Sequence, residues 1–360
     1  MLAAVRRVAA GKGFVIEDYP SPELRDTDAL VRIEAAGLCG TDVQIWNGTY
    51  IGRTGPIEPP LIAGHEFVGR VVAIGTRVSG FEIGDRVTTN AIEGCGKCYA
   101  CKRGLEHQCH DWRHLGVTTN GGFAEYCAAP AKTLFRVPDQ LESRQAAILE
   151  PMSIAARTLR NNSIDPGDTV VVIGPGPFGL FLLQAAIASG AGKTIVIGLA
   201  SDEMRLRAAR ICGASEIVRA DTTDPIKAVR DLTDGAGADL VIEATADSDV
   251  VPQALQMVRQ GGTVIMAGSG YKGKPVTFEP WNVVRDEITI RGTEGFTRND
   301  FLNALGLLSV GKFRVDPIVT HEMPLTQINQ ACELVERKQA IKIVLRLTQR
   351  HNSRDSSVNQ

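Results

Sequence analysis

The sequence predicts an α/β protein in which a compact, mostly β domain, built as an irregular barrel, accompanies a doubly wound parallel sheet. Short candidate strands with frequent glycine occupy the chain up to about residue 152, a texture typical of a small barrel. From residue 168 onward, β-branched runs alternate with helical stretches, as in β-α-β units whose strands are buried on both faces. A chain of 360 residues is long enough for two or three domains.

In the first half, strands are expected over 29–35, over 67–75 and from residue 84 onward, with a turn and a further strand over 121–127. The first strand alternates loosely between apolar and polar residues and leads directly into Cys39. Glycines interrupt the later strands, which favours bent barrel strands over a flat sheet.

A thiol, an imidazole and a carboxylate occur in this barrel region as Cys39 and the adjacent pair His65 and Glu66. This set suits Zn²⁺, and a catalytic zinc takes three protein ligands while a fourth position stays open. Adjacent His65 and Glu66 can converge on one ion at a strand-to-loop bend. A buried cysteine beside a surface His-Glu pair remains the alternative on these residues alone.

Four cysteines in one short segment give the most specific signal, a C-x₂-C-x₂-C-x₇-C pattern formed by Cys95, Cys98, Cys101 and Cys109. Four thiolates predict a closed, tetrahedral structural zinc site. An iron–sulfur cluster is the alternative, but the fourth spacing and the missing proline after Cys109 weigh against it. The neighbouring histidines are interpreted as loop surface, and the remaining cysteines as buried thiols: His107, His110, His114, Cys127, Cys212 and Cys332.

Glu150 follows the apolar run 146–149 and precedes Pro151. It is either a charge at a helix end or a carboxylate aimed into a site, and both interpretations stay open.

A dinucleotide fingerprint begins after the β-branched strand 169–173 and leads into an apolar helix over 180–189. Its first glycine allows a tight turn, the second lets the backbone approach a pyrophosphate, and the third lets helix and strand pack closely. The strand–glycine loop–helix context makes the motif specific, because further strands follow near 194–197, 240–243 and 263–267. The loop residues expected to hold the cofactor are Gly174, Gly176, Pro177, Phe178 and Gly179.

The second strand of this unit departs from the pattern, because Gly198 occupies the place of the acidic residue that binds the ribose of NAD. Ser201, Arg205 and Arg207 follow and suit a 2′-phosphate, whereas Asp202 or Glu203 could reach back and restore NAD. The cofactor is therefore expected to be NAD or NADP, with a slight preference for NADP.

Beyond residue 292 the parallel pattern ends, and helices over 300–308 and 325–337 precede a strand over 342–346 that we expect to rejoin the barrel. The expected domains are 1–152 together with 294–348, carrying a metal lobe at about 93–112, then 153–293, and a polar, disordered tail over 349–360.

Composition excludes several classes of partner. A net charge of -2 and a pI near 6.3 argue against nucleic acid and anionic membranes. The sequence has no apolar run of the roughly 18–20 residues that a membrane span needs, and its N-terminus lacks the features of a signal peptide. We therefore expect a cytoplasmic protein whose eight cysteines are metal ligands or free thiols.

Over nearly all of residues 1–348 the chain resembles the zinc-dependent medium-chain dehydrogenases, most closely the sorbitol (polyol) and threonine dehydrogenase branch. The shared motifs are Cys39-Gly-Thr-Asp42, Gly64-His65-Glu66, Gly84-Asp85-Arg86-Val87, the four cysteines, Leu149-Glu150-Pro151 and the glycine loop.

The resemblance implies a GroES-like catalytic domain and a Rossmann coenzyme domain with the active site in the cleft between them. It implies that Cys39, His65 and Glu66 hold the catalytic zinc, with Glu150 near the metal, bound directly or through water. Alcohol dehydrogenases of the typical branch have cysteine there, so Glu150 favours the polyol and threonine branch. Thr41 matches the hydroxyl that passes the proton outward, and Gln44 replaces a histidine found in many relatives.

The expected activity is hydride transfer between a secondary alcohol or polyol, or its ketone, and NAD(P), with threonine 3-dehydrogenase-like oxidation as the alternative. A non-catalytic cofactor-binding protein would lack zinc ligands, which are all present. Segment 292–298 does not match the Arg and Tyr of polyol enzymes, which puts a sugar alcohol in doubt. Trp46, Tyr50 and Phe296 are either pocket walls or packing. A homodimer or homotetramer is expected, with contacts near 263–268 and 287–292.

Overall fold

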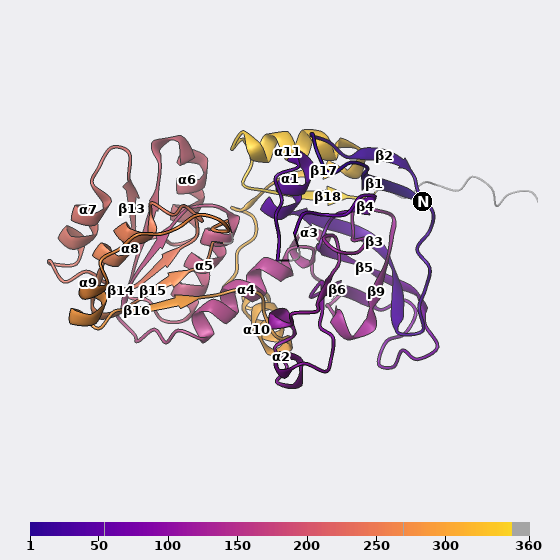
Figure 1. Cartoon of the computed structure of the whole chain (residues 1–360), viewed down its shortest axis with the longest axis horizontal. Coiled ribbons are helices and arrows are strands. Elements are labelled where there is room, and N and C mark those ends of the chain that lie inside the picture. Colours follow the sequence, from indigo (N-terminus) through magenta and orange to yellow (C-terminus); the bar gives the residue numbers. More distant parts are fainter. Residues whose placement is uncertain (54, 269, 348–360) are drawn as a thin grey trace, which may run out of the picture.

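The computed structural model describes residues 1–347 apart from residues 54 and 269. The expectation for the tail over 349–360 lies outside these residues. Figure 1 shows a parallel sheet at one end of the molecule and barrel strands at the other, with α4 (Leu149–Arg160) and α10 (Arg298–Ser309) between them.

The barrel end is built around a seven-stranded sheet in the order β10-β6-β5-β3-β18-β17, with β9 also paired to β3. The C-terminal strand β18 pairs antiparallel with β3, so the last described strand returns to the barrel. The strands are β3 (Asp28–Leu38), β5 (Glu66–Ile74), β6 (Arg86–Thr89), β9 (Tyr126–Pro130), β10 (Leu134–Arg136), β17 (Val319–Pro324) and β18 (Lys342–Arg346). A three-stranded sheet, β2-β1-β4, packs beside it through β1 (Leu2–Arg6), β2 (Val15–Asp18) and β4 (Leu61–Ile62).

Short elements complete this end of the molecule. The helices are α1 (Gly40–Asn47), α2 (Tyr99–Lys102), α3 (Ser143–Ala146) and α11 (Ile328–Glu336), and the hairpin pairs β7 (Ile92–Glu93) with β8 (Arg113–His114). Single 3₁₀ turns cover Glu106–Gln108, Ala131–Thr133 and Leu325–Gln327 at this end, and another, Ala200–Asp202, belongs to the other end of the molecule.

The other end is a six-stranded parallel sheet in the order β13-β12-β11-β14-β15-β16. Numbered along the chain this is 3-2-1-4-5-6, the order of a dinucleotide-binding fold, which confirms the predicted doubly wound sheet. The strands are β11 (Thr169–Ile173), β12 (Lys193–Gly198), β13 (Glu216–Arg219), β14 (Ala238–Glu243), β15 (Val258–Met266) and β16 (Thr289–Gly292).

Helices cover both faces of the parallel sheet because its strands are apolar on both sides. On β11, Val170 and Val172 face a core with α4 and α5, while Val171 and Ile173 face a second core with α7 and α8. The helices are α5 (Pro177–Ala188), α6 (Glu203–Ile211), α7 (Pro225–Leu232), α8 (Val251–Met257) and α9 (Pro280–Arg285). Among the described residues, no helix has the length and apolarity required to cross a membrane.

Candidate active site and structural metal centre

The structure brings Cys39, His65 and Glu66 together, with one potential ligand atom of each within 4.8 Å of the others. Cys39 follows the end of β3 and caps helix α1, while His65 lies in the turn before β5. Glu66 opens β5 and is paired across the sheet with Gly37 on β3. Two neighbouring strands and the turn before one of them therefore deliver the three side chains to one point.

Two glycines make this convergence possible. A Cβ on Gly37 would lie 2.3 Å from Glu66 Oε2, so any side chain at residue 37 would collide with the carboxylate. Gly64 has φ +91°, and a Cβ there would lie 2.5 Å from the Phe123 ring. The turn that presents His65 thus needs a residue that tolerates both the left-handed conformation and the close contact.

Buried Asp42 contacts the segments that carry Cys39 and His65. The sequence did not reveal this role, although Asp42 ends the Cys-Gly-Thr-Asp motif. Its Oδ2 accepts the Cys39 N–H at 2.8 Å, and its Oδ1 accepts the Gly64 N–H at 3.2 Å. Oδ1 also lies 3.6 Å from His65 Nδ1. Burial alone would lower the pKa of His65, but Asp42 and Cys39 together raise it well above its usual value.

Lys342 on β18 provides a second contact that sequence reasoning missed. Its Nζ lies 2.7 Å from Glu66 Oε1, and both side chains are buried. The other carboxylate oxygen, Oε2, is buried and has no hydrogen-bond partner in the described part of the chain. Leaving such polar atoms unpaired costs about 1–3 kcal/mol each, so this donor set fits a bound zinc ion.

Glu150 stands in the first turn of α4 and is buried beside this cluster. Burial, opposed by the charge of His65 and reinforced by Glu66, raises the pKa of Glu150 to about 7. Its oxygens lie outside the group of atoms within 4.8 Å that Cys39, His65 and Glu66 form. The pKa of Glu150 therefore responds to the charges of His65 and Glu66. Direct coordination of zinc by Glu150 stays a prediction.

The raised pKa of Glu150 predicts a pH-dependent proton release when zinc is added to metal-free protein. At about pH 6 the carboxyl group is largely protonated and must lose its proton to act as a ligand, whereas at about pH 8.5 it is already ionised. We expect wild type to release about one proton more than Glu150→Gln at the lower pH and the same number at the higher pH. Calorimetry in buffers of different ionisation enthalpy measures this number. If wild type and Glu150→Gln released the same number of protons at both pH values, Glu150 would not be a ligand of the metal.

The four-cysteine segment forms a second cluster, because Sγ atoms of Cys95, Cys98, Cys101 and Cys109 all lie within 4.8 Å of one another. Backbone N–H groups already point at two of the sulfurs, from Cys95 to Cys109 Sγ at 3.3 Å and from Cys101 to Cys98 Sγ at 3.5 Å. Backbone N–H groups of Lys97 and Cys98 lower the pKa of Cys95 to about 6. Thiolates held in this way fit a structural zinc ion.

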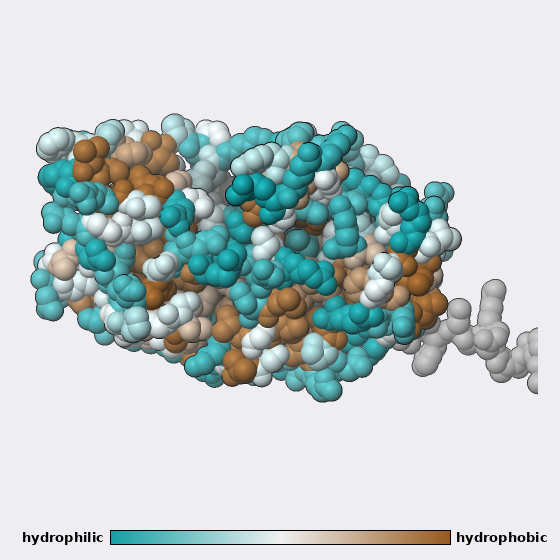
Figure 2. All heavy atoms as spheres, turned by 90° about the horizontal axis from the view of Figure 1, so that it is seen from below, coloured by the Kyte–Doolittle hydropathy of each residue, from teal (hydrophilic) through white to brown (hydrophobic). Residues whose placement is uncertain are grey.

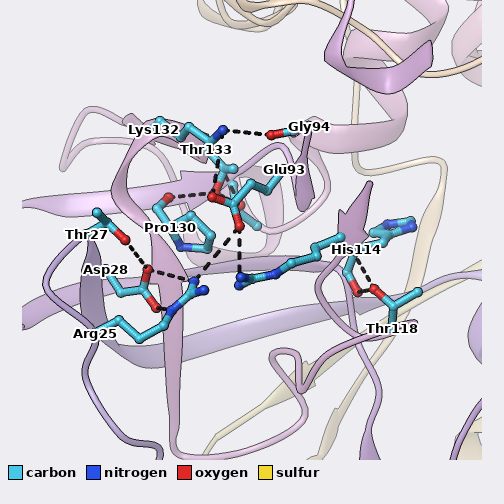
Figure 3. A network of polar contacts seen from close by, with 12 residues as sticks. Arg25, Thr27, Asp28, Glu93, Gly94, His114, Thr118, Pro130, Lys132 and Thr133 are labelled. Carbon is cyan, nitrogen blue, oxygen red and sulfur yellow. Dashed lines mark hydrogen bonds and ion pairs between the residues drawn. The ribbon is translucent and has the colours of Figure 1, made fainter. Parts of the chain in front are cut away.

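Glu93, at the base of this lobe, ties it to the barrel through the polar network in Figure 3. Its carboxylate lies 3.2 Å from Arg113 NH2 within the hairpin, and 3.7 Å from Lys132 Nζ and 3.9 Å from Arg25 NH2 on the barrel. Lys132 also donates to the Gly94 carbonyl at 3.0 Å. The lobe is therefore held in place by several contacts besides its cysteines.

The interpretation of His107 and His114 as loop surface is wrong, whereas His110 is exposed as expected. His107 is 2% exposed, and burial lowers its pKa to about 4. It packs against Gly295, where a Cβ would lie 2.6 Å from that of His107. The lobe folds back onto the segment before α10, a long-range contact that the local spacing of the cysteines did not indicate.

His114 extends the lobe to the catalytic cluster. Its ring centroid lies 5.3 Å from that of His65 and 5.0 Å from that of Trp112, and Arg53 covers the Trp112 ring at 4.6 Å. Burial lowers the pKa of His114 well below its usual value, so a neutral imidazole lines the cluster on this side.

Of the three aromatic residues proposed as pocket walls or packing, two are packing. Trp46 is 3% exposed in the barrel core and donates through Nε1 to Asn329 Oδ1 at 3.0 Å, and Phe296 is 1% exposed in the core beside α4. Tyr50 is half-buried, and its pKa, raised mainly by burial, also responds to the charges of His65 and Cys39. Tyr50 is therefore the aromatic residue of the three that adjoins the site.

The glycine loop has the geometry that a dinucleotide requires. Gly174 has φ +101°, and a Cβ on Gly179 would lie 1.9 Å from the Gly174 carbonyl oxygen. Gly176 caps α5, Pro177 is its first residue, and half-buried Phe178 packs on the core. A Cβ on Gly176 would meet nothing within 4 Å, so the backbone at the helix N-terminus faces open space, where a pyrophosphate fits.

At the end of β12, the acidic side chains of the described chain that lie near the place of the ribose-binding residue are bonded to other groups, and the exposed Asp221 accepts the Ala200 N–H at 2.9 Å. A Cβ on Gly198 would lie 2.8 Å from the Pro175 ring. Asp202 is 7% exposed and accepts the Leu199 N–H at 3.2 Å. Glu203 accepts from Arg207 at 3.0 Å and from Arg219 at 2.9 Å. Ser201 is exposed, and the half-buried Arg205 has a buried Nε without a hydrogen-bond partner in the described chain.

Comparison with known proteins agrees with this geometry. Residues 25–139 match the family model of the alcohol dehydrogenase GroES-like domain, and residues 177–309 match that of the zinc-binding dehydrogenases. Among solved structures, a zinc-binding dehydrogenase of Sinorhizobium meliloti 1021 bound to NADP superposes with a TM-score of 0.89 and 27% identity, over 96% of this chain and 98% of that one.

Two named relatives align with almost the whole chain. A sorbitol dehydrogenase of Halalkalibacterium halodurans is 32% identical over 96% of this chain and 99% of its own. An L-threonine 3-dehydrogenase of Bacillus licheniformis is 35% identical over 92% of this chain and 95% of its own. The protein belongs to the zinc-dependent medium-chain dehydrogenases, enzymes that transfer hydride between an alcohol and NAD(P), and the predicted GroES-like and Rossmann architecture is confirmed.

Proposed function

We propose that the protein oxidises a secondary alcohol or polyol, or reduces the corresponding ketone, at a zinc ion held by Cys39, His65 and Glu66. The observation that carries this proposal is the convergence of these three side chains within 4.8 Å, with a buried oxygen of Glu66 left without a partner. Zinc bound there would lower the pKa of a substrate hydroxyl, and the nicotinamide would accept the hydride.

The residues around the cluster supply orientation and proton transfer. Asp42 holds the Cys39 backbone and faces His65, and Lys342 fixes one oxygen of Glu66. Thr41, in the first turn of α1, is the hydroxyl that we propose to pass the proton toward solvent. Gln44 in the same helix is exposed and cannot titrate. Beyond Thr41, we propose that the proton leaves through Glu150, the cofactor ribose and water.

Thr41→Ala is expected to reduce turnover by roughly tenfold or more, because proton transfer by a positioned group contributes at least that much. Zinc content should stay unchanged, since Thr41 is not among the three clustered ligands. Steady-state kinetics and metal analysis measure both quantities. Thr49→Ala, which removes an exposed hydroxyl bonded to Asn47, is the control, and equal turnover in both variants would exclude Thr41 from the relay.

We further propose two zinc ions per chain, one at each cluster, and a slight preference for NADP. Two separate donor sets support the two zinc ions. The preference for NADP is supported by the glycine at residue 198 and by the bonds of Asp202 and Glu203 to other groups. The proposed cofactor contacts are the residues of the glycine loop together with Gly198, Ser201 and Arg205.

L-Threonine is the second candidate substrate, because the threonine dehydrogenase relative is at least as similar as the sorbitol dehydrogenase. The test is reduction of NAD⁺ and NADP⁺ by purified protein with polyols, diols, simple secondary alcohols and threonine, with and without a chelator. Chelator-sensitive reduction of either cofactor supports the proposal, and the responding alcohol selects the branch. If the chelator removed the metal and the rate of cofactor reduction stayed the same, the proposed zinc-dependent reaction would be contradicted.

A homodimer or homotetramer is proposed, joined through the outer edge of the parallel sheet. All four residues of the edge strand β16 are exposed, and its free backbone groups can pair with another strand. Figure 2 shows an apolar patch at the parallel-sheet end of the molecule. Trp281 and Val284 on α9 and Ile290 on β16 are exposed. We expect Ile290→Lys to shift the wild-type oligomer toward smaller species in analytical ultracentrifugation. A monomeric wild type at micromolar concentration would refute this assembly.

The domain bounds that we propose are 1–152 with 294–348 for the catalytic domain, including the lobe at about 93–112, and 153–293 for the coenzyme domain. The pairing of β18 with β3 supports the discontinuous first domain. We also propose a cytoplasmic location, supported by eight cysteines of which none forms a disulfide. Fractionation of cells tests it, and recovery with membranes would contradict it.

A further inference from the structure

Lys338 occupies an unusual backbone position directly after α11. Its φ is +57°, in the left-handed region that favours glycine. The Lys338 N–H donates to the Val335 carbonyl at 3.0 Å, and the Gln339 N–H donates to the Leu334 carbonyl at 2.8 Å. This pair of bonds is the helix-ending motif in which glycine is the usual residue at the left-handed position. A lysine there is unfavourable for the backbone alone.

The Lys338 side chain reaches from the catalytic domain to the coenzyme domain. Its Nζ lies 3.1 Å from Asp202 Oδ1, and Asp202 is 7% exposed. The same carboxylate accepts the Leu199 N–H at 3.2 Å and lies 3.6 Å from Arg205 NH1. In Figure 1, α11 lies at the top of the barrel end and α6 at the top of the parallel-sheet end.

This contact lies at the place where the two nicotinamide cofactors differ. The residue at the end of the second strand of such a fold binds the adenosine ribose, and a nearby cation accommodates the 2′-phosphate of NADP. Here that strand, β12, ends at Gly198, and Asp202 bonds the next backbone N–H. One carboxylate therefore holds two cations, Lys338 and Arg205, beside the ribose position.

We propose that Lys338 is a specificity-determining residue that binds the 2′-phosphate of NADP beside Asp202. Lys338 and Arg205 share the carboxylate of Asp202, and the neighbouring carboxylate of Asp221 accepts the Ala200 N–H at 2.9 Å, so the Lys338 ammonium group has no carboxylate to itself and can also bind a phosphate. An ammonium group has three donors, so Lys338 can keep its bond to Asp202 while it donates to a phosphate oxygen. Because the lysine comes from the catalytic domain, a 2′-phosphate would bridge both domains. The inference rests on the proposed preference for NADP.

Lys338→Gly tests the proposal without endangering the fold, because glycine suits the left-handed position better than lysine does. Dissociation constants of NADPH and NADH are measured by quenching of protein fluorescence in the zinc-loaded enzyme. We expect the variant to bind NADPH roughly tenfold more weakly, the usual effect of losing one charge-assisted hydrogen bond, and NADH within about twofold of wild type. Arg337→Met is the matched control, since it removes the adjacent exposed cation.

The possible outcomes distinguish the role of Lys338 from the proposed preference for NADP. A wild type that prefers NADPH, with a selective loss in Lys338→Gly and none in Arg337→Met, supports both. A wild type that prefers NADPH and an unchanged variant, or an equal loss for both cofactors, overturns the role of Lys338 alone. A wild type that binds NADH as tightly as NADPH or more tightly overturns the cofactor preference and the inference together.

Discussion

Cys39→Ala is expected to reduce turnover by at least about a thousandfold, because the loss of a zinc ligand removes stabilisation worth several kcal/mol in the transition state. The variant should hold one zinc ion where wild type holds two, since the four-cysteine cluster is a separate donor set. The protein should remain folded, because Cys39 is a half-exposed residue at the end of β3 and its main-chain bond to Asp42 does not involve the sulfur.

The control for this variant is Cys212→Ala, which removes a buried thiol that has no other cysteine, histidine or carboxylate clustered with it in the described chain. It should retain both zinc ions and full turnover. Metal analysis and initial rates are measured side by side. Two zinc ions in Cys39→Ala, or turnover equal to that of the control, would be incompatible with the proposed catalytic centre.

Cys109→Ser is expected to lower the unfolding midpoint by roughly 5–10 °C, because a structural zinc site contributes several kcal/mol to folding. Cys109 is fully buried and packs with Ile92 and Trp112 in the small core of the lobe. Its loss should also reduce turnover, because the same lobe carries His114 to within 5.3 Å of the His65 ring.

Scanning calorimetry with metal analysis tests this second prediction, and Cys127→Ser serves as the control. Cys127 is a buried thiol on β9 outside both clusters, so its replacement reports the effect of a hydroxyl at a buried site alone. If Cys109→Ser kept two zinc ions and melted with the control, the four cysteines would not be a metal site.

Elements with strong local patterns could be predicted from the sequence. The β-branched run before the glycine loop is β11, and the final apolar strand is β18 with the expected bounds. Four cysteines within fifteen positions also converge as expected, because a short loop keeps them close. The clustering of Cys39 with His65 and Glu66 came partly from family resemblance, since their approach depends on the pairing of β3 with β5.

Contacts between distant parts of the chain could not be predicted. Lys342 reaches Glu66 only because β18 returns to β3, and a lysine in an apolar strand carries no local sign of that contact. The burial of His107 and His114 has no local sign, because the spacing of the cysteines describes the metal loop and not what the loop packs against. Lys338 meets Asp202 over a separation of 136 positions, so neither local sequence indicates the other.

The most direct test of the catalytic centre is anomalous diffraction at the zinc absorption edge from crystals of the protein as purified. We expect two anomalous peaks per chain, one among the four cysteines and one among Cys39, His65 and Glu66. A single peak at the four cysteines, with the second cluster metal-free in active protein, would contradict it.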